Sequence, residues 1–231
     1  MTEFHFQGMI YSKQHYLDVF KVDTATLDRL VQEGISSGGS YCDIFFENTS
    51  YGSLLLRDGA VTSGGNHIDY GVGIRVLSGE KTGYAYSEST SYADMLACAK
   101  AAARIADSPS DVSPYGTGSP SRGEPNPDAD RYPMKTPWGD LRMDSYLPFL
   151  RSLEAKIREK DSRIIKITVS LAFQVSDILM YNSSRELKWD TRPMGSVSAT
   201  VVFSQNGKVE NKSTSRSFRT GVEMLSDSLA D

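Results

Sequence analysis

The sequence predicts an α+β fold in which antiparallel sheets pack against helices. Short segments of alternating apolar and polar residues, typical of half-buried strands, follow one another through turns rich in glycine and asparagine. Segments with apolar residues at helical spacing stand before and after these runs of strands. In a parallel α/β fold a helix would instead separate each pair of strands, so the order of elements favours α+β.

The first helix is expected from Asp23 to about residue 37. Asp23 is a typical N-cap residue, because its side chain can accept a hydrogen bond from a free backbone N–H group of the first turn. Glycines 38 and 39 then end the helix. Its apolar residues recur at the spacing of one helical face: Leu27, Leu30, Val31 and Ile35.

A run of antiparallel strands is expected next. Residues 41–47 and 51–57 are strand-like, and Asp58-Gly59 is a hairpin signal because both residues tolerate positive φ angles. Residues 67–77 alternate, with Ile68 to Val76 apolar at every second position. Residues 78–83 form a turn and 84–87 return as a strand, before an alanine-rich helix from about 91 to 106.

The composition divides the chain into three parts. Residues 1–106 form the first α+β unit, and residues 107–139 form a connector that holds seven of the nine prolines. Residues 140–231 form a second block of helix and antiparallel strands. Whether the two blocks pack as one domain stays open at this point.

The second block opens with a helix at about residues 144–160, in which Pro148 is tolerable only in the first turn. Four strands are expected at residues 163–176, 177–183, 186–190 and 196–204, with Asn206-Gly207 as a second hairpin signal. Residues 221–229 begin a helical pattern that has no terminating signal. We therefore expect the chain to be part of something longer.

The overall charge argues against some classes of function. The formal net charge is −4 and the basic residues are dispersed, so we expect no direct contact with nucleic acid. No run of about 18 apolar residues suggests a membrane span, and the start lacks a secretory signal, so a cytoplasmic location is the default expectation. Cys42 and Cys98 are interpreted as small core residues without a disulfide.

The histidines do not form a metal-binding pattern. None of His5, His15 and His67 is spaced as in H-x-x-x-H or H-E-x-x-H, so this chain alone is expected to hold no catalytic residue and no metal site. His5 and His15 are interpreted as exposed residues of an irregular leader. His67 is interpreted as a polar residue on the solvated face of a strand.

One surface is a candidate for binding a substrate or partner. Arg75, Lys81, Tyr84 and Tyr86 lie on adjoining predicted strands, where they could contact a peptide that is added along the edge of the sheet. The alternative is a solvated face with ordinary cross-strand pairs. Gly71 and Gly73 do not fit a dinucleotide motif, and they would either let a backbone approach the sheet or relieve a bend.

Three segments carry a resemblance to a known family. Residues 40–47 read S-Y-C-D-I-F-F-E, residues 54–59 read L-L-L-R-D-G, and residues 69–86 read D-Y-G-V-G-I-R-V-L-S-G-E-K-T-G-Y-A-Y. The order of these segments resembles the amino-terminal region of the TldD/PmbA family, on its TldD branch. The likeness resumes at residues 190–193 and 197–203.

The resemblance implies a protomer of a zinc metallopeptidase that acts on peptides or unfolded proteins, in a family also described as modulators of DNA gyrase. It implies a second TldD/PmbA-type protomer as partner, in a homodimer or a heterodimer, and zinc as the cofactor of the full-length family protein. The family's H-E-x-x-x-H motif has no counterpart in this chain. We therefore expect a region for substrate positioning and dimerisation that is inactive alone; the alternative is a non-catalytic regulatory module on the same scaffold.

Overall fold

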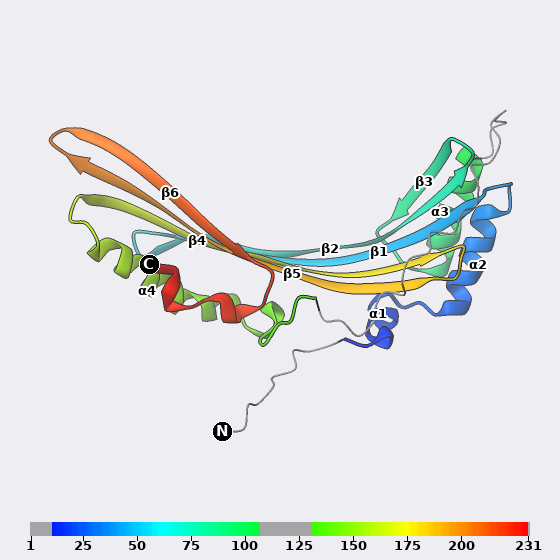
Figure 1. Cartoon of the computed structure of the whole chain (residues 1–231), viewed down its shortest axis with the longest axis horizontal. Helices are drawn as coiled ribbons and strands as arrows, with labels where there is room; N and C mark the ends of the chain where they lie inside the picture. Colours follow the sequence, from blue (N-terminus) through cyan, green and yellow to red (C-terminus); the bar gives the residue numbers. More distant parts are fainter. Residues whose placement is uncertain (1–10, 107–130, 231) are drawn as a thin grey trace, which may run out of the picture.

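The computed structural model describes residues 11–106 and 131–230, and its centre is one long antiparallel sheet (Figure 1). The sheet has six strands in the order β3-β2-β1-β4-β5-β6. Strands from both predicted blocks therefore share one sheet, which β1 and β4 join along most of their length. The strands are β1 Tyr41–Arg57, β2 Ala60–Ser78, β3 Lys81–Ser87, β4 Ile164–Asn182, β5 Leu187–Gln205 and β6 Lys208–Phe218.

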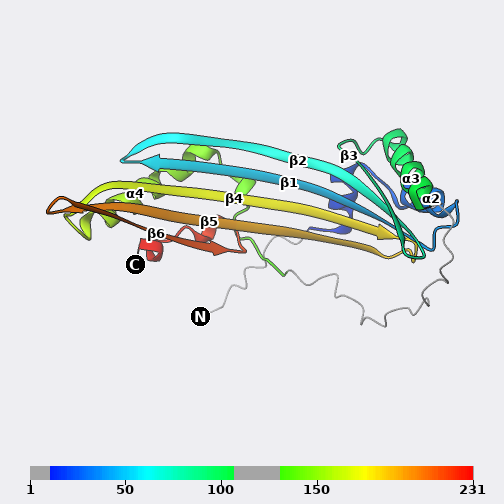
Figure 2. The same ribbon diagram turned by 90° about the horizontal axis from the view of Figure 1, so that it is seen from above.

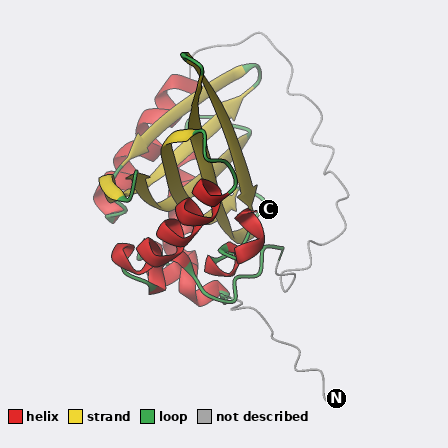
Figure 3. Cartoon of the chain, turned by 90° about the vertical axis from the view of Figure 1, so that its left-hand side faces the viewer, coloured by secondary structure: helices red, strands yellow, loops and turns green. Residues whose placement is uncertain are grey.

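The helices gather at the two ends of one face of this sheet, and the opposite face carries none of the described helices (Figures 1 and 3). That opposite face is called the open face below, and it lies on the concave side of the curved sheet in Figure 1. One end carries α1 Lys13–Phe20, α2 Thr24–Ile35 and α3 Tyr92–Ala106. The other carries α4 Leu147–Glu159 and the 3-10 turns η1 Trp138–Asp140, η2 Met143–Tyr146, η3 Val222–Met224 and η4 Asp227–Ala230.

Three of the expected strand boundaries are wrong. Segments 41–47 and 51–57 belong to the single strand β1, segments 163–176 and 177–183 to β4, and segments 186–190 and 196–204 to β5. Strands β1, β2, β4 and β5 run nearly the full length of the molecule (Figure 2). Polar residues interrupt the apolar pattern at mid-strand because two separate helix groups cover the two ends of the sheet. At the centre, the hydroxyl oxygens of Thr49 and Ser176 lie 2.7 Å apart, within hydrogen-bond distance.

Two hydrophobic cores lie between the helices and the sheet. The first packs α1, α2 and α3 against residues such as Ile44, Phe46 and Ile74. The second packs α4 and the 3-10 turns against Leu54, Leu56 and their neighbours on β4 and β5. The even-numbered residues of β1 contribute to both cores, because alternate side chains of a strand point to the same face.

The two hairpin signals form the turns that the sequence predicts. Asp58 and Gly59 have φ angles of 48° and 79°, and Asn206 and Gly207 have φ angles of 52° and 77°. These positive values match the turn type that fits the twist of a two-residue hairpin. Asp58 also accepts a hydrogen bond from the Ile167 N–H at 2.9 Å, which ties the β1–β2 turn to β4.

The helix signals are confirmed in part. Asp23 accepts a hydrogen bond from the Thr26 N–H at 2.6 Å, and Pro148 lies in the first turn of α4. The expected helix at residues 221–229 is wrong, because this segment forms the two 3-10 turns η3 and η4. No helix within the described ranges is long and apolar enough to cross a membrane.

Residues 131–139, the described end of the predicted connector, pack against the sheet. Met134 and Trp138 are buried in the second core, although the surrounding sequence is rich in proline. The Trp138 indole N–H donates a hydrogen bond to the Thr220 carbonyl oxygen at 2.9 Å. This contact joins the segment before α4 to the segment after β6.

Candidate functional site

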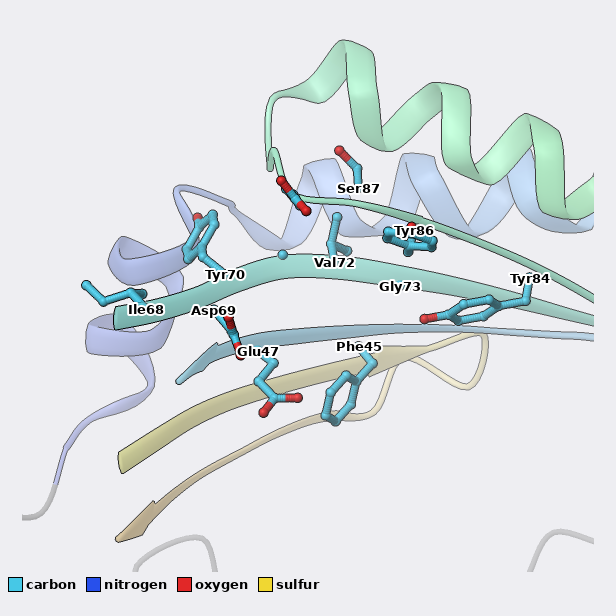
Figure 4. A pocket seen from close by; sticks show the side chains of 12 residues that line it. Phe45, Glu47, Ile68, Asp69, Tyr70, Val72, Gly73, Tyr84, Tyr86 and Ser87 are labelled. Carbon is cyan, nitrogen blue, oxygen red and sulfur yellow. The ribbon is translucent and has the colours of Figure 1, made fainter. Parts of the chain in front are cut away.

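A hollow of about 600 Å³ lies where β1, β2 and β3 adjoin (Figure 4). We call it the tyrosine–glycine hollow. Gly71 and Gly73 of β2 carry no side chain on the open face, whereas their β1 neighbours Glu47 and Phe45 do, and the Tyr84 ring lies over Gly73. The hollow is lined by Phe45 and Glu47 of β1 and by residues 68–73 of β2. Tyr84, Tyr86 and Ser87 of β3 line its other side, together with Glu88, which follows β3.

Two tyrosines form one wall of the hollow. Tyr84 pairs with Arg75 and Tyr86 pairs with Gly73 across the β2–β3 ladder, so both rings stand on the open face. Tyr84 is 56% exposed and Tyr86 is 72% exposed. Large aromatic side chains with this much exposure are typical of binding surfaces more than of a folded core.

The glycines allow close approaches by other parts of the chain. A Cβ atom on Gly73 would lie 2.5 Å from the Tyr84 hydroxyl oxygen and 3.0 Å from its ring. A Cβ atom on Gly71 would lie 2.6 Å from the Ser87 carbonyl oxygen, a backbone atom. At Gly71 the close approach is therefore by backbone, one of the two predicted roles, whereas at Gly73 it is by the Tyr84 side chain.

Arg75 of the predicted surface is held by an ion pair. Its guanidinium group donates two hydrogen bonds to the carboxylate of Asp43, one of them from Nε at 3.2 Å. The hydrogen bonds raise the pKa of Arg75, and partial burial lowers it to a smaller extent. Asp43 is 7% exposed, so this carboxylate depends on the arginine for its partner.

We expect Arg75→Ala to lower the free energy of unfolding by about 1 kcal/mol, because it leaves the Asp43 carboxylate without its charged partner. Urea unfolding of Arg75→Ala, Asp43→Ala and the double variant measures this. The two single losses should not add in the double variant, because both remove the same pair. An unchanged stability in Arg75→Ala would show that the pair makes no net contribution to stability.

The structure places the four predicted surface residues in two groups. Tyr84 and Tyr86 line the hollow, whereas Arg75 stands beside it and is bound to Asp43. Lys81 pairs with Ser78 at the far end of the β2–β3 hairpin and does not line the hollow. Their role in binding stays a prediction.

Sequence reasoning missed the acidic side of the hollow. Glu47 lies on β1, Asp69 on β2 and Glu88 after β3, and all three line it. The alternation of residues 67–77 puts Asp69 on the polar face of its strand. Glu47 can be assigned to that face only with the β1–β2 register, in which Thr49 pairs with Asp69 and Glu47 with Gly71. That pairing makes Glu47 and Asp69 diagonal neighbours.

The expectation for His15 is wrong. It belongs to α1, and its ring stacks on Tyr11 with centroids 4.3 Å apart. Its Nε2 atom is buried, 3.7 Å from the nearer Asp177 carboxylate oxygen. His67 is exposed, as expected, and stacks on Tyr51 at 4.4 Å. His5 lies outside the described residues.

The described residues do not provide a site for the metal that the resemblance implies. Within residues 11–106 and 131–230, no three His, Cys, Asp or Glu side chains are grouped so that they could hold a metal ion. Cys42 and Cys98 are buried and free, as expected for core residues. Burial, with a smaller contribution from Asp43, raises the pKa of Cys42 to about 12, so its thiol stays protonated at neutral pH.

Comparison with known proteins agrees with this architecture. Residues 42–106 match a family model described as PmbA/TldA metallopeptidase domain 1, and residues 137–231 match the PmbA/TldA metallopeptidase central domain. A metalloprotease TldD homologue from Haemophilus influenzae is 33% identical over 184 residues, which are 79% of this chain and 37% of that protein. A TldD homologue from Buchnera aphidicola of Schizaphis graminum is 24% identical over 188 residues, which are 80% of this chain and 37% of that protein.

Solved structures show the same fold at low sequence identity. A Bacteroides thetaiotaomicron protein named for modulation of DNA gyrase matches with a TM-score of 0.65 and 12% identity, over 85% of this chain and 45% of its own. TldE from Thermococcus kodakarensis matches with a TM-score of 0.60 and 16% identity, over 84% and 43%. The chain thus spans less than half the length of these relatives. Since the two family models together cover more than half of its residues, the chain belongs to the PmbA/TldD family, of which it carries domain 1 and the central domain.

Proposed function

We propose that this chain is the substrate-positioning part of a PmbA/TldD-type zinc metallopeptidase. In this proposal the tyrosine–glycine hollow and the adjoining edge of β2 hold an extended peptide or an unfolded segment of a protein. Residues outside the described ranges bind the zinc and carry out the hydrolysis in this proposal; residues 11–106 and 131–230 show no group suited to a metal. When bound elsewhere in the protein, zinc would activate water for attack on the peptide bond.

The observation that carries the proposal is the unpaired edge beside the hollow. β3 pairs with β2 only between Val72 and Ser78, whereas β2 extends to Ala60. Among the described residues, the outer edge of β2 from Ala60 to Gly71 therefore has no strand partner. Its backbone N–H and C=O groups can form a ladder with a peptide that continues the line of β3.

This edge has little protection from pairing: between residues 60 and 71, its protecting features are a register shift opposite Leu55 and Leu56 and the charged residue Asp69. Natural edge strands are commonly blocked by lysine, proline or a covering segment. Residues 60–71 contain neither lysine nor proline, and residues 60–69 are all exposed. An edge of this kind is suited to a partner strand, and the hollow at its end offers side-chain contacts that a bare edge would lack.

The proposal includes a second PmbA/TldD-type protomer as partner. The open face supports this part, because a second molecule facing the concave side of the sheet would enclose the peptide away from solvent. Sedimentation of the purified protein measures self-assembly, and a monomer at all concentrations would contradict a homodimer and leave only a heterodimer for this part of the proposal.

Filling the hollow is expected to weaken peptide binding about tenfold or more, since a new side chain clashes with the bound peptide. Gly73→Leu is the test, measured by fluorescence anisotropy with a labelled unstructured peptide. The Tyr84 side chain can swing toward solvent to accommodate the leucine, so we expect the fold to persist.

Gly139→Leu is the matched control, because a Cβ atom on Gly139 meets nothing within 4 Å. Gly139 lies in η1, at the end of the sheet away from the hollow. It should bind the peptide like the unaltered protein. Equal affinity of all three proteins would show that the peptide does not occupy the hollow.

A further inference from the structure

The hollow has a chemical preference that goes beyond its shape. Resting on the proposed function, we infer that it is a subsite for a basic side chain, lysine or arginine, of the extended peptide. Three kinds of observation support this: the charges of the lining residues, the aromatic rings beside them, and the engagement of the nearby basic groups by other partners.

The charges of the lining are all of one sign. Glu47, Asp69 and Glu88 come from three different segments and meet at this hollow. Among the described residues that line it there is no lysine, arginine or histidine. A cationic side chain would therefore find complementary charge there, and an acidic one would be repelled.

Two of the carboxylates are close neighbours. Glu47 and Asp69 are diagonal across the β1–β2 ladder, and Figure 4 shows their side chains beside each other. Glu47 accepts a hydrogen bond from the Thr49 hydroxyl at 2.7 Å, which orients its carboxylate along the open face. Burial comes first among the causes that raise the pKa of Tyr51, followed by the charges of Asp69 and Glu47, so their negative field reaches the next residues along the face.

Aromatic rings complete the subsite. Tyr84 and Tyr86 stand on one side of the glycines and Phe45 on the other. The faces of such rings attract cations, and the aliphatic stem of lysine or arginine packs on them. A hollow of about 600 Å³ is large enough for a long side chain together with part of the peptide backbone.

Arginines on the open face have acidic partners of their own. Arg75 binds Asp43, and Arg192 on β5 donates a hydrogen bond from Nε to Asp190 at 2.8 Å. They leave the charge of the hollow uncompensated. A peptide paired with β2 would point every second side chain to the open face, where the hollow lies.

The test compares two peptides on the 231-residue chain. One is an unstructured Gly/Ser peptide with lysines at alternate positions, and the other has glutamine in place of each lysine. We expect the lysine peptide to bind about tenfold more tightly at low salt, because charge-assisted and cation–π contacts add to the backbone ladder. The double variant Glu47→Gln with Asp69→Asn should remove this preference and leave the affinity for the glutamine peptide unchanged.

Glu80→Gln is the matched control, since Glu80 is exposed on the β2–β3 turn and does not line the hollow. If both peptides bind equally and Gly73→Leu abolishes that binding, the preference for a basic side chain is overturned and the peptide site is retained. Binding of neither peptide would overturn the proposed function as well. A calcium ion bound at the carboxylates, detected by calorimetry and lost in the double variant, would also overturn the inference.

Discussion

Trp138→Ala is expected to lower the free energy of unfolding by about 3–5 kcal/mol, the range for removing a fully buried large aromatic residue. Trp138 is 0% exposed, and its ring stacks on Phe173 of β4 with centroids 4.8 Å apart. A Cβ atom on Gly195 would lie 2.3 Å from the indole, so the ring lies directly on the backbone of β5. Its loss would leave a cavity that these rigid strands cannot fill.

Urea or thermal unfolding followed by circular dichroism measures this effect. Trp138→Phe retains the ring contact with Phe173 but loses the hydrogen bond to Thr220, so we expect an intermediate loss. Trp189→Ala is the control, because Trp189 is only partly buried, at the edge of the first core. A loss in Trp138→Ala no larger than in Trp189→Ala would contradict the role of Trp138 as the centre of the second core.

Glu223→Gln is expected to lower the free energy of unfolding by about 2 kcal/mol at neutral pH. Glu223 accepts hydrogen bonds from the backbone N–H groups of Lys135, Thr136 and Gly221, at 3.0 to 3.1 Å, and from the Thr220 hydroxyl. Burial raises the pKa of Glu223, but these hydrogen bonds outweigh burial and hold it at about 2, below the ordinary value of 4.5.

The pH dependence has a definite sign. Because the folded state holds the pKa of Glu223 below its unfolded value, its stabilisation is fully present above pH 4.5 and is lost as the pH falls toward about 2. The difference between the protein and Glu223→Gln should therefore be largest at neutral pH and shrink in that acidic range. Glu210→Gln, an exposed position on β6, serves as control. A difference that grows as the pH falls would contradict this account.

Local signals in the sequence predicted the turns, caps and cysteines well. Asp58-Gly59 and Asn206-Gly207 form hairpins, Asp23 caps α2, and Cys42 and Cys98 are buried and free. The turns and the cap depend on a few neighbouring residues, whose backbone preferences act over the same short range, whereas the cysteines were predicted from the general tendency of free cysteine to be buried. Strand lengths failed because the polar residues near Thr49 resemble a loop in sequence, whereas in the sheet they find partners such as Ser176 on a distant strand.

The candidate site was only partly visible. Tyr84, Tyr86, Gly71 and Gly73 lie on two strands joined by a short turn, so their proximity follows from the hairpin. Glu47 and Phe45 come from the strand before, and their place beside the glycines depends on the β1–β2 register over its full length. The partner of Arg75 could not be predicted for the same reason, because Asp43 is the cross-strand neighbour that this register selects.

The sequence by itself determined the α+β class, the helix and hairpin boundaries at Asp23, Asp58 and Asn206, and the resemblance to the TldD/PmbA family. These follow from local conformational preference and from motifs that are contiguous in the chain. Only the tertiary structure decided that both blocks share one sheet, that Trp138 of the predicted connector is core, and that three carboxylates meet at the tyrosine–glycine hollow. These features depend on which distant strands pair and in which register, and that choice is made by the burial of whole sheet faces.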